Sequence, residues 1–271
     1  MRRTSLIAAL LSCTVGLAGC KSAPPCPVQM RTDARQALAD HASRHSGWRS
    51  IKAEARVTQW GRGGRVRGTV LMFLERPNRA RFDVMTQLGP AAVLTSDGES
   101  FQLSDLREGV FLYGPTCPEN LTRFLGISVD ADDIVRLLTG DTPLIEAVEQ
   151  HIECRDGRYV VTLVAADGAT QALVFSVDEA DRDQPPDAQR LTLRRSTVRA
   201  PDGAKKWEAR YDEHVVIDGH SFPTEVRFID EINGVDTSVR VKSISVDPVV
   251  PDEAFQQAPR PGMSVELAPC S

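Results

Sequence analysis

The residues that could carry chemistry are few and lie far apart along the chain. His41 and His45 stand one helical turn apart, a spacing that can place two imidazoles on one metal ion, but no third ligand accompanies them. We therefore expect both on the solvated face of a short helix. Asp130, Asp132 and Asp133 precede an apolar helical pattern and are typical of charge at a helix start. We find no activated nucleophile and no acid–base pair in the sequence, so we expect no catalytic residue, no metal and no cofactor.

Four cysteines beyond residue 20 offer oxidative chemistry instead. An even number of cysteines in an exported chain predicts up to two disulfides, and three pairings are open. No pair has the close CxxC spacing of zinc sites. We favour Cys117 with Cys154, which would close a helical insertion at its two ends, and Cys26 with Cys270, which would join the two tails.

The N-terminus has the composition of an export signal. A basic start is followed by the apolar run 6–15 and by Leu17-Ala18-Gly19-Cys20. The run is shorter than the ~20 apolar residues of a membrane span, so residues 1–19 are predicted to be a secretory signal peptide. The closing tetrapeptide resembles the lipobox of bacterial lipoproteins, which implies cleavage before Cys20 and lipid attachment to it. The alternative is an ordinary cleaved signal with an incidental cysteine.

Residues 20–31 are expected to form a lipidated N-terminus and a flexible tether. Pro24, Pro25 and Pro27 favour an extended chain there. Lys21 stands where an aspartate retains many Gram-negative lipoproteins in the inner membrane, so its presence favours the outer membrane, with the folded domain facing the periplasm.

Net charge narrows the classes of partner. Loss of Arg2 and Arg3 with the signal leaves 30 basic residues against 37 acidic ones, a net charge of −7. This balance argues against nucleic acid and against electrostatic adhesion to anionic lipid. Attachment to a membrane would therefore come from the acyl group on Cys20.

Strand patterns joined by turn dipeptides dominate the body of the chain. In 79–85, for example, Ala80, Phe82 and Val84 alternate with charged residues, the mark of a half-buried strand. Tight hairpins predict antiparallel pairing, and so many strands must curl. The predicted fold is mainly β (α+β): a large curled antiparallel sheet or half-open β-barrel of about 11–12 strands, with helices packed in its open side. The expected strands are 52–60, 65–75, 79–86, 91–96, 100–105, 110–114, 158–165, 169–177, 189–199, 206–216, 222–230 and 235–246.

Two stretches have helical periodicity. The first, 32–45, places Ala34, Ala37, Leu38 and His41 on one stripe. The second, 131–139, begins after a plausible N-cap, Asp130. It is expected to cover the open side of the sheet as a lid helix, with its apolar side formed by Ile134, Leu137 and Leu138.

The order of these elements resembles the LolA/LolB lipoprotein-carrier family, with a helix, six hairpin-joined strands, a helical insertion and further strands. Segment 82–98 is similar to the strand, protruding Leu-Gly loop and return strand of the outer-membrane receptor of that family. Segment 134–140 is similar to the family's helix that ends in Leu-x-Gly, and 250–255 looks like a tail phrase of carrier-fold proteins. The resemblance implies a single carrier-fold domain over 32–256, followed by a C-terminal tail, 257–271.

The resemblance also implies a membrane-insertion loop, Gln87, Leu88, Gly89 and Pro90. Leu88 at its apex matches the exposed leucine with which the receptor contacts membrane during delivery. Gln87 departs from the family, in which a proline is usual, and Pro90 follows the glycine instead. The alternative is that Leu88 caps the rim of the barrel from inside.

Apolar strand residues are expected to line a cavity for acyl chains, or alternatively to pack a solid core. The candidates are Val57, Val70, Met72, Leu74, Phe82, Val84, Phe101, Trp207, Tyr211, Phe222, Val226, Phe228 and Val239.

We therefore expect a monomeric, membrane-anchored, non-enzymatic protein that binds the acyl chains of lipids or lipoproteins. It would accept cargo from a periplasmic carrier and help to place lipoproteins in the outer membrane. The alternative is a structural or protein-docking envelope lipoprotein that uses the same fold without lipid transfer.

Overall fold

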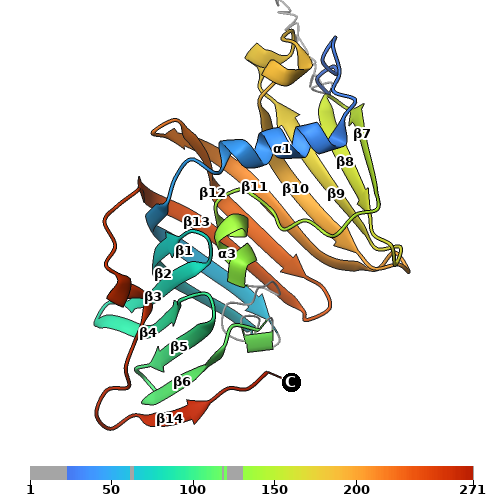
Figure 1. The fold of residues 1–271 in the computed structure, drawn as a ribbon. Helices are drawn as coiled ribbons and strands as arrows, with labels where there is room; N and C mark the ends of the chain where they lie inside the picture. Colours follow the sequence, from blue (N-terminus) through green and yellow to red (C-terminus); the bar gives the residue numbers. More distant parts are fainter. Residues whose placement is uncertain (1–22, 62–63, 118, 121–130, 271) are drawn as a thin grey trace, which may run out of the picture.

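The alternating segments of the sequence form one continuous sheet in the computed structural model, which describes residues 23–61, 64–117, 119–120 and 131–270 (Figure 1). The strand order is β14-β6-β5-β4-β3-β2-β1-β13-β12-β11-β10-β9-β8-β7, and the sheet curls without closing. The strands are β1 (Ser50–Gly61), β2 (Gly64–Glu75), β3 (Arg79–Thr86), β4 (Gly89–Ser96), β5 (Ser100–Asp105), β6 (Val110–Pro115), β7 (Glu149–Arg155), β8 (Arg158–Val164), β9 (Thr170–Val177), β10 (Leu191–Arg199), β11 (Lys205–Ile217), β12 (His220–Asp230), β13 (Val235–Val246) and β14 (Ser264–Leu267).

The predicted fold class, a mainly β half-open barrel, is confirmed. Alternation along the predicted strands places apolar residues on the concave side: in β1, Ile51 and Ala53 are buried while Lys52 is exposed. All twelve expected strands are present, with ends that differ by no more than two residues. β7 and β14 are additional strands at the two edges of the sheet. β14 pairs with β6 in parallel, the exception in a sheet whose other pairs are antiparallel, and it lies within the expected tail 257–271.

Two α-helices lie on the concave side of the sheet (Figure 1). α1 (Ala34–Arg44) begins after Asp33, whose carboxylate accepts a 3.0 Å hydrogen bond from the backbone N–H of Gln36, and it crosses the strands from β9 to β12. α3 (Ala131–Leu138) lies over the other half, where it contacts β3. The expected N-cap of this helix, Asp130, falls outside the described residues. Within those residues, neither helix has the length and apolar character needed to cross a bilayer.

A crossing segment, residues 139–147, leads from α3 to β7 over the concave side. Gly140 ends the helix with a φ of +94°, and a Cβ there would lie 2.8 Å from Cδ of Pro223. Gln171 of β9 holds the segment through hydrogen bonds to the carbonyl of Pro143 (2.8 Å) and from the N–H of Ile145 (2.9 Å). The segment therefore occupies part of the concave side, and the periodicity of the sequence did not predict this.

The disulfide pairing expected from the sequence is wrong. The structure joins Cys26 to Cys154 and Cys117 to Cys270. β6 and β14 run in parallel, so Cys117 and Cys270, which follow these strands, arrive at the same end of the sheet. The N-terminal segment runs beside the β7–β8 hairpin, where the Pro24 carbonyl approaches Gly157, and this brings Cys26 to the end of β7.

The second half of the expected tether is fixed to the sheet rather than mobile. The N–H of Arg31 donates a 2.9 Å hydrogen bond to Tyr159, and the Arg31 guanidinium pairs with Asp40 at 2.6 Å. Gln189 donates to the carbonyl of Gln29 at 2.8 Å. Together with the Cys26 disulfide, these contacts attach the part of the expected tether from Cys26 to Arg31 to the rest of the domain.

Candidate functional site

A cavity of about 420 Å³ opens on the concave side, beside α3. Its walls come from β1 to β4, β13 and the β5–β6 turn. Most of its surface is apolar, the character of pockets that bind lipid-like ligands. The described lining residues are Val57, Gln59, Val66, Arg67, Gly68, Val70, Met72, Phe82, Val84, Met85, Thr86, Ala91, Ala92, Asp105, Arg107, Leu138, Thr237 and Val239.

The structure divides the thirteen expected lining residues into two groups. Six of them border this cavity: Val57, Val70, Met72, Phe82, Val84 and Val239. The other seven pack in the interior of the protein away from it, and six of these are at most 2% exposed while Trp207 is partly buried. They are Leu74, Phe101, Trp207, Tyr211, Phe222, Val226 and Phe228.

The covering elements explain this division for the five core residues on β11 and β12, whereas Leu74 and Phe101 are buried at the far ends of β2 and β5. Over β9 to β12, α1 and the crossing segment lie on the concave side, so the apolar residues there meet the chain itself. Trp48 packs its ring against Phe222 at 6.0 Å between centroids, and the Tyr211 hydroxyl donates a 3.0 Å hydrogen bond to the Asp141 carbonyl. Over β1 to β4, by contrast, concave space is left open. The chain itself thus fills the concave space over β9 to β12, whereas the concave space over β1 to β4 contains the cavity.

The expected lid helix contributes one of its three residues to the cavity. Leu138, at the end of α3, lines it. Ile134 and Leu137 are 3% and 0% exposed and belong to the core. α3 is therefore held against the core by Ile134 and Leu137, and its last residue, Leu138, borders the cavity.

The loop between β3 and β4 projects from the molecule at the cavity mouth. Leu88 at its apex is fully exposed, which excludes the alternative that this residue caps the rim from inside. The Thr86 hydroxyl shapes the turn: it donates to the Gly89 carbonyl at 2.7 Å and accepts from the Leu88 N–H at 3.3 Å. Gly89 has a φ of +113°, a conformation that glycine adopts without strain.

A shallow second hollow of about 500 Å³ lies beside this loop. It is bordered by Leu88 and Pro90 and shares Thr86, Ala91 and Arg107 with the main cavity. The loop singled out from the sequence and the hollow half of the sheet are therefore neighbours in space.

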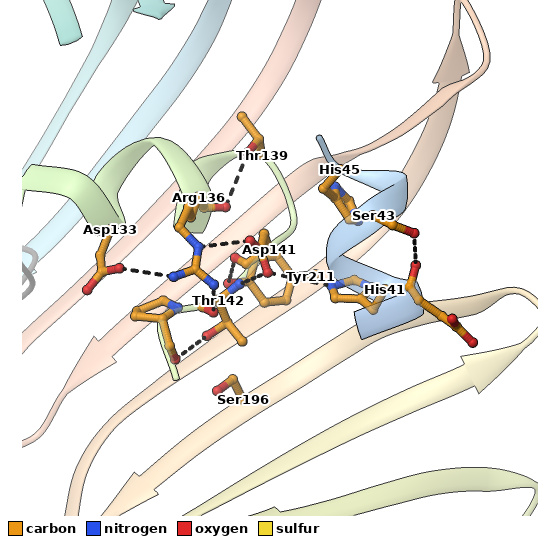
Figure 2. A network of polar contacts seen from close by, with 12 residues as sticks. His41, Ser43, His45, Asp133, Arg136, Thr139, Asp141, Thr142, Ser196 and Tyr211 are labelled. Atoms are coloured by element: carbon orange, nitrogen blue, oxygen red, sulfur yellow. Dashed lines mark hydrogen bonds and ion pairs between the residues drawn. The ribbon is translucent and has the colours of Figure 1, made fainter. Parts of the chain in front are cut away.

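A buried polar network joins α3, the crossing segment and α1 (Figure 2). Arg136 donates to the Asp141 carboxylate at 2.8 Å and to the Thr142 carbonyl at 3.0 Å, and it lies 3.5 Å from Asp133. Burial acts to raise the pKa of Asp141, but the hydrogen bond and charge of Arg136 outweigh burial and hold that pKa below its ordinary value. Asp141 is therefore ionised and paired at neutral pH.

His41 and His45 lie beside this network, and the expectation of a solvated helix face is wrong. They are 3% and 8% exposed, with ring centroids 4.6 Å apart. Burial lowers the pKa of both and brings that of His45 to about 3, so both imidazoles are neutral at pH 7. Nε2 of His41 is 3.9 Å from Oδ1 of Asp141, too far for a hydrogen bond.

The network lies apart from the main cavity, and His45 borders a separate hollow of about 390 Å³. None of Arg136, Asp141, His41 and His45 is among the described residues that line the cavity. Among the described residues, the close cluster of metal-ligand types is Cys117, Glu119 and Cys270, and its two sulfurs are bonded to each other. The sequence did not reveal the network because its members come from distant elements, although the apolar spacing of Ala34, Ala37 and His41 did signal that His41 faces inward.

Comparisons with known proteins agree on the architecture. No protein-family model and no curated protein matches the sequence. Among solved structures, a LolA superfamily protein from Nitrosomonas europaea is 11% identical, with a TM-score of 0.53 over 83% of this chain and 97% of its own.

Two further structures give similar values. An outer membrane lipoprotein-sorting protein domain from Vibrio parahaemolyticus is 9% identical, with a TM-score of 0.52 over 82% of this chain and 97% of its own. A DUF1329 family protein from Desulfovibrio piger is 11% identical, with a TM-score of 0.54 over 83% of this chain and 98% of its own. At these identities the likeness is one of fold alone: the chain shares the curled, half-open sheet of these structures.

Proposed function

We propose that this protein is a lipid-anchored, non-enzymatic carrier-fold protein that accepts an acyl chain of a lipid or lipoprotein in its cavity and helps to place the cargo in the outer membrane. The observation that carries the proposal is the apolar cavity left open beside a fully exposed leucine. A protein interior normally packs without voids of this size, so an open apolar hollow is typical of a binding site.

The cavity suits cargo that shares lipid and little else. Its apolar walls contribute non-directional contacts, each buried methylene contributing about 0.8 kcal/mol. Handover then needs no nucleotide, because it depends on the protein holding cargo more tightly than its donor does and less tightly than the membrane does. The donor in this scheme is a periplasmic carrier, and the protein acts as a monomer.

Leu88 orients the protein and the acylated Cys20 anchors it. One leucine leaving water contributes about 1.5 to 3 kcal/mol, which is too little for stable attachment and enough to favour one orientation. Two or more acyl chains on the N-terminal cysteine supply the anchorage. The exposed loop next to the cavity mouth would then bring the opening to a membrane surface.

A second candidate is a protein-docking envelope lipoprotein without lipid transfer. The filled half of the concave side favours it, because α1 and the crossing segment themselves occupy the concave space there. This candidate predicts a cavity that stays free of lipid in the cell.

The test is to isolate the protein with Cys20→Ser, so that no lipid of its own is present, and to analyse the intact protein by native mass spectrometry. We expect co-purifying acyl-chain compounds that organic extraction removes. Preparations free of lipid that also take up no fatty acid would contradict lipid carriage and favour the docking candidate.

A further inference from the structure

The β3–β4 loop that carries Leu88 is one of three neighbouring hairpin ends at one end of the sheet. In the strand order, the hairpins β3–β4, β1–β2 and β12–β13 follow one another (Figure 1). Trp60 near the end of β1 pairs with Asp236 near the start of β13, and Met85 near the end of β3 pairs with Thr69 in the first half of β2. Neighbouring strands lie about 4.8 Å apart, so successive hairpins are about 10 Å apart. We call this part of the molecule the Leu88 end.

Each of the three hairpins presents a large apolar side chain to solvent at the Leu88 end. Leu88 is fully exposed, Ile232 of the β12–β13 turn is 64% exposed, and Trp60 is 40% exposed. Val66 pairs with Gln59, the residue before Trp60, and its side chain is exposed and borders the cavity. Val66 therefore belongs both to the cavity wall and to this row of exposed apolar residues.

The turns at the opposite end of the sheet differ in composition. The β2–β3, β4–β5 and β11–β12 turns are formed by 76–78, 97–99 and 218–219. None of these three turns contains a leucine, isoleucine, valine or aromatic residue. Exposed apolar residues scattered singly are normal on a protein surface, whereas apolar residues gathered on consecutive hairpins at one end indicate an interaction surface.

The side chains around the row fit a lipid bilayer as the partner. The guanidinium carbon of Arg65 lies over the Trp60 ring, 5.5 Å from its centroid. Tryptophan is typical of the membrane–water interface because its ring is apolar and its N–H is polar, and arginine packs its stem on apolar surface while its charge stays in water. Glu231, next to Ile232, is paired with Lys205 at 2.7 Å. This charge is therefore satisfied within the protein and requires no charged partner.

From these observations we propose that the protein docks on a lipid bilayer through the whole Leu88 end, with Trp60 and Ile232 as membrane-contact residues beside Leu88. This inference rests on the membrane contact of Leu88 in the proposed function and extends it from one hairpin to three. Side chains about 10 Å apart can each enter a fluid bilayer without a preformed pocket, whereas a protein partner would need a complementary pocket for each. Because Val66 borders the cavity, docking through this end would bring the cavity wall to the bilayer surface.

The experiment measures binding of the full mature chain with Cys20→Ser to vesicles of phosphatidylcholine, which carry no net charge. Without acyl chains on residue 20, the folded domain alone must provide the binding, which is measured by sedimentation. The variants are Trp60→Gln, Ile232→Gln and Leu88→Gln. The matched control is Val216→Gln, because Val216 is 69% exposed, close to the value for Ile232, and lies beside the β11–β12 turn at the opposite end of the sheet.

We expect each of the three variants to weaken vesicle binding by about tenfold or more, because each removes an apolar side chain from the bilayer. Val216→Gln should change binding by less than about twofold. Trp60 is the most exposed tryptophan of the described chain, so brominated phosphatidylcholine should quench its fluorescence in the bound state. This quenching should be lost in Trp60→Phe, which keeps an aromatic ring and should still bind.

Weaker binding in Leu88→Gln alone, with no quenching of Trp60, would overturn docking through three hairpins and leave the single-loop contact of the proposed function in place. If Leu88→Gln also binds as tightly as the Cys20→Ser parent, the membrane contact of Leu88 fails as well. No binding by the parent would overturn this inference, whereas lipid carriage is decided separately by native mass spectrometry. Dimers that Ile232→Gln dissociates, in a protein that does not bind vesicles, would make this end a contact between two copies and overturn the bilayer as its partner.

Discussion

Arg136 donates a 2.8 Å hydrogen bond from Nε to Oδ2 of Asp141, and through this contact the end of α3 is fixed to the crossing segment. The same guanidinium holds the carbonyl of Thr142, while the Asp141 carbonyl accepts from Tyr211 of β11. The pair therefore sets the position of Leu138, the residue of α3 that borders the cavity.

Replacing Arg136 with alanine is expected to lower the free energy of unfolding by about 2 to 3 kcal/mol, because it leaves the buried Asp141 carboxylate without its charged partner. Adding Asp141→Asn should recover part of this loss, since the remaining amide carries no charge. Urea denaturation measures both. Arg158→Ala, at an exposed position, is the control and should change stability by less than about 0.5 kcal/mol. Equal stability of Arg136→Ala and the unmodified protein would show that the pair does not hold α3.

Stability should also fall on mild acidification. Burial, with the charges of His41 and Arg76 acting in the same direction, lowers the pKa of His45 from 6.5 to about 3. The unfolded chain binds a proton at this residue below about pH 6.5 while the folded protein stays neutral there, so the stabilisation is complete above pH 6.5 and is lost as the pH falls toward 3. The slope is about 1.4 kcal/mol per pH unit. His214, with a pKa lowered to about 4, acts in the same direction and contributes less because it is more exposed.

The measurement is the free energy of unfolding at pH 7, 6 and 5. His45→Asn should reduce the slope in this window, whereas His151→Asn, at an exposed position on β7, should leave it unchanged. A slope that is the same with and without His45 would show that its protonation does not differ between the folded and unfolded states.

The sequence predicted the parts of this fold that depend on local alternation and missed those that depend on distant partners. Strands such as β3 are predictable from the sequence because every second residue is apolar. β7 has one buried residue, Ile152, and β14 has none, so neither carries the pattern. β14 is placed by long-range contacts, its pairing with β6 and the disulfide of Cys270. β7 pairs with β8 in a local hairpin, and the Cys154 disulfide adds a long-range link to the N-terminal segment.

The sequence predicted an apolar cavity but not which of the apolar strand residues would line it. Tyr211 and Phe228 have the same alternating context as Val70 and Phe82, yet the first pair is core and the second lines the hollow. The difference is made by the crossing segment, an irregular stretch whose course no periodicity reveals. Which apolar residues are covered is therefore a tertiary property. Leu88 was identified through the resemblance of segment 82–98 to the strand, Leu-Gly loop and return strand of the family's receptor, and not from any periodicity of its own.

Filling the cavity should abolish lipid uptake without unfolding the protein. Gly68 lines the hollow, and a Cβ built there meets Cγ1 of Val84 at 3.8 Å, an ordinary contact. Gly68→Leu therefore places a side chain in open space and, because glycine weakens a strand, should keep or raise the melting temperature. We expect at least tenfold weaker binding of palmitate. Gly61→Leu, on the neighbouring strand with nothing within 4 Å of its Cβ and no place on the cavity wall, is the control. Unchanged uptake by Gly68→Leu would place the lipid elsewhere.

The disulfide of Cys26 should affect both the stability of the domain and the distance between the domain and the expected lipid on Cys20. Cys26→Ser/Cys154→Ser is expected to lower stability by about 2 to 5 kcal/mol, because the bond joins residues 128 positions apart and its entropic effect on the unfolded chain grows with the logarithm of that separation. With the bond intact, residues 20–25 span at most about 20 Å, so its loss lengthens the tether. Peptide mapping without reduction should recover the 26–154 and 117–270 links. Recovery of 117–154 or 26–270 links instead would contradict this connectivity.

Leu88 should act in delivery and not in capture. Replacing it with glutamate removes about 1.5 to 3 kcal/mol of membrane contact, a roughly tenfold to hundredfold change in affinity for a bilayer surface. Cargo capture should be unaffected, because the Leu88 side chain is fully exposed and Leu88 is not among the residues that line the main cavity.

The assay loads the protein with a fluorescent acyl compound and follows its transfer to liposomes. Val249→Glu supplies the matched control, since Val249 is as exposed as Leu88. Val249 follows the C-terminal end of β13, whereas the β12–β13 turn lies at the N-terminal end of that strand. Leu88→Phe should keep delivery because it preserves an apolar apex. If Leu88→Glu delivers as fast as Val249→Glu, the loop does not meet the membrane, and the cavity must exchange lipid through a route that does not involve its exposed leucine.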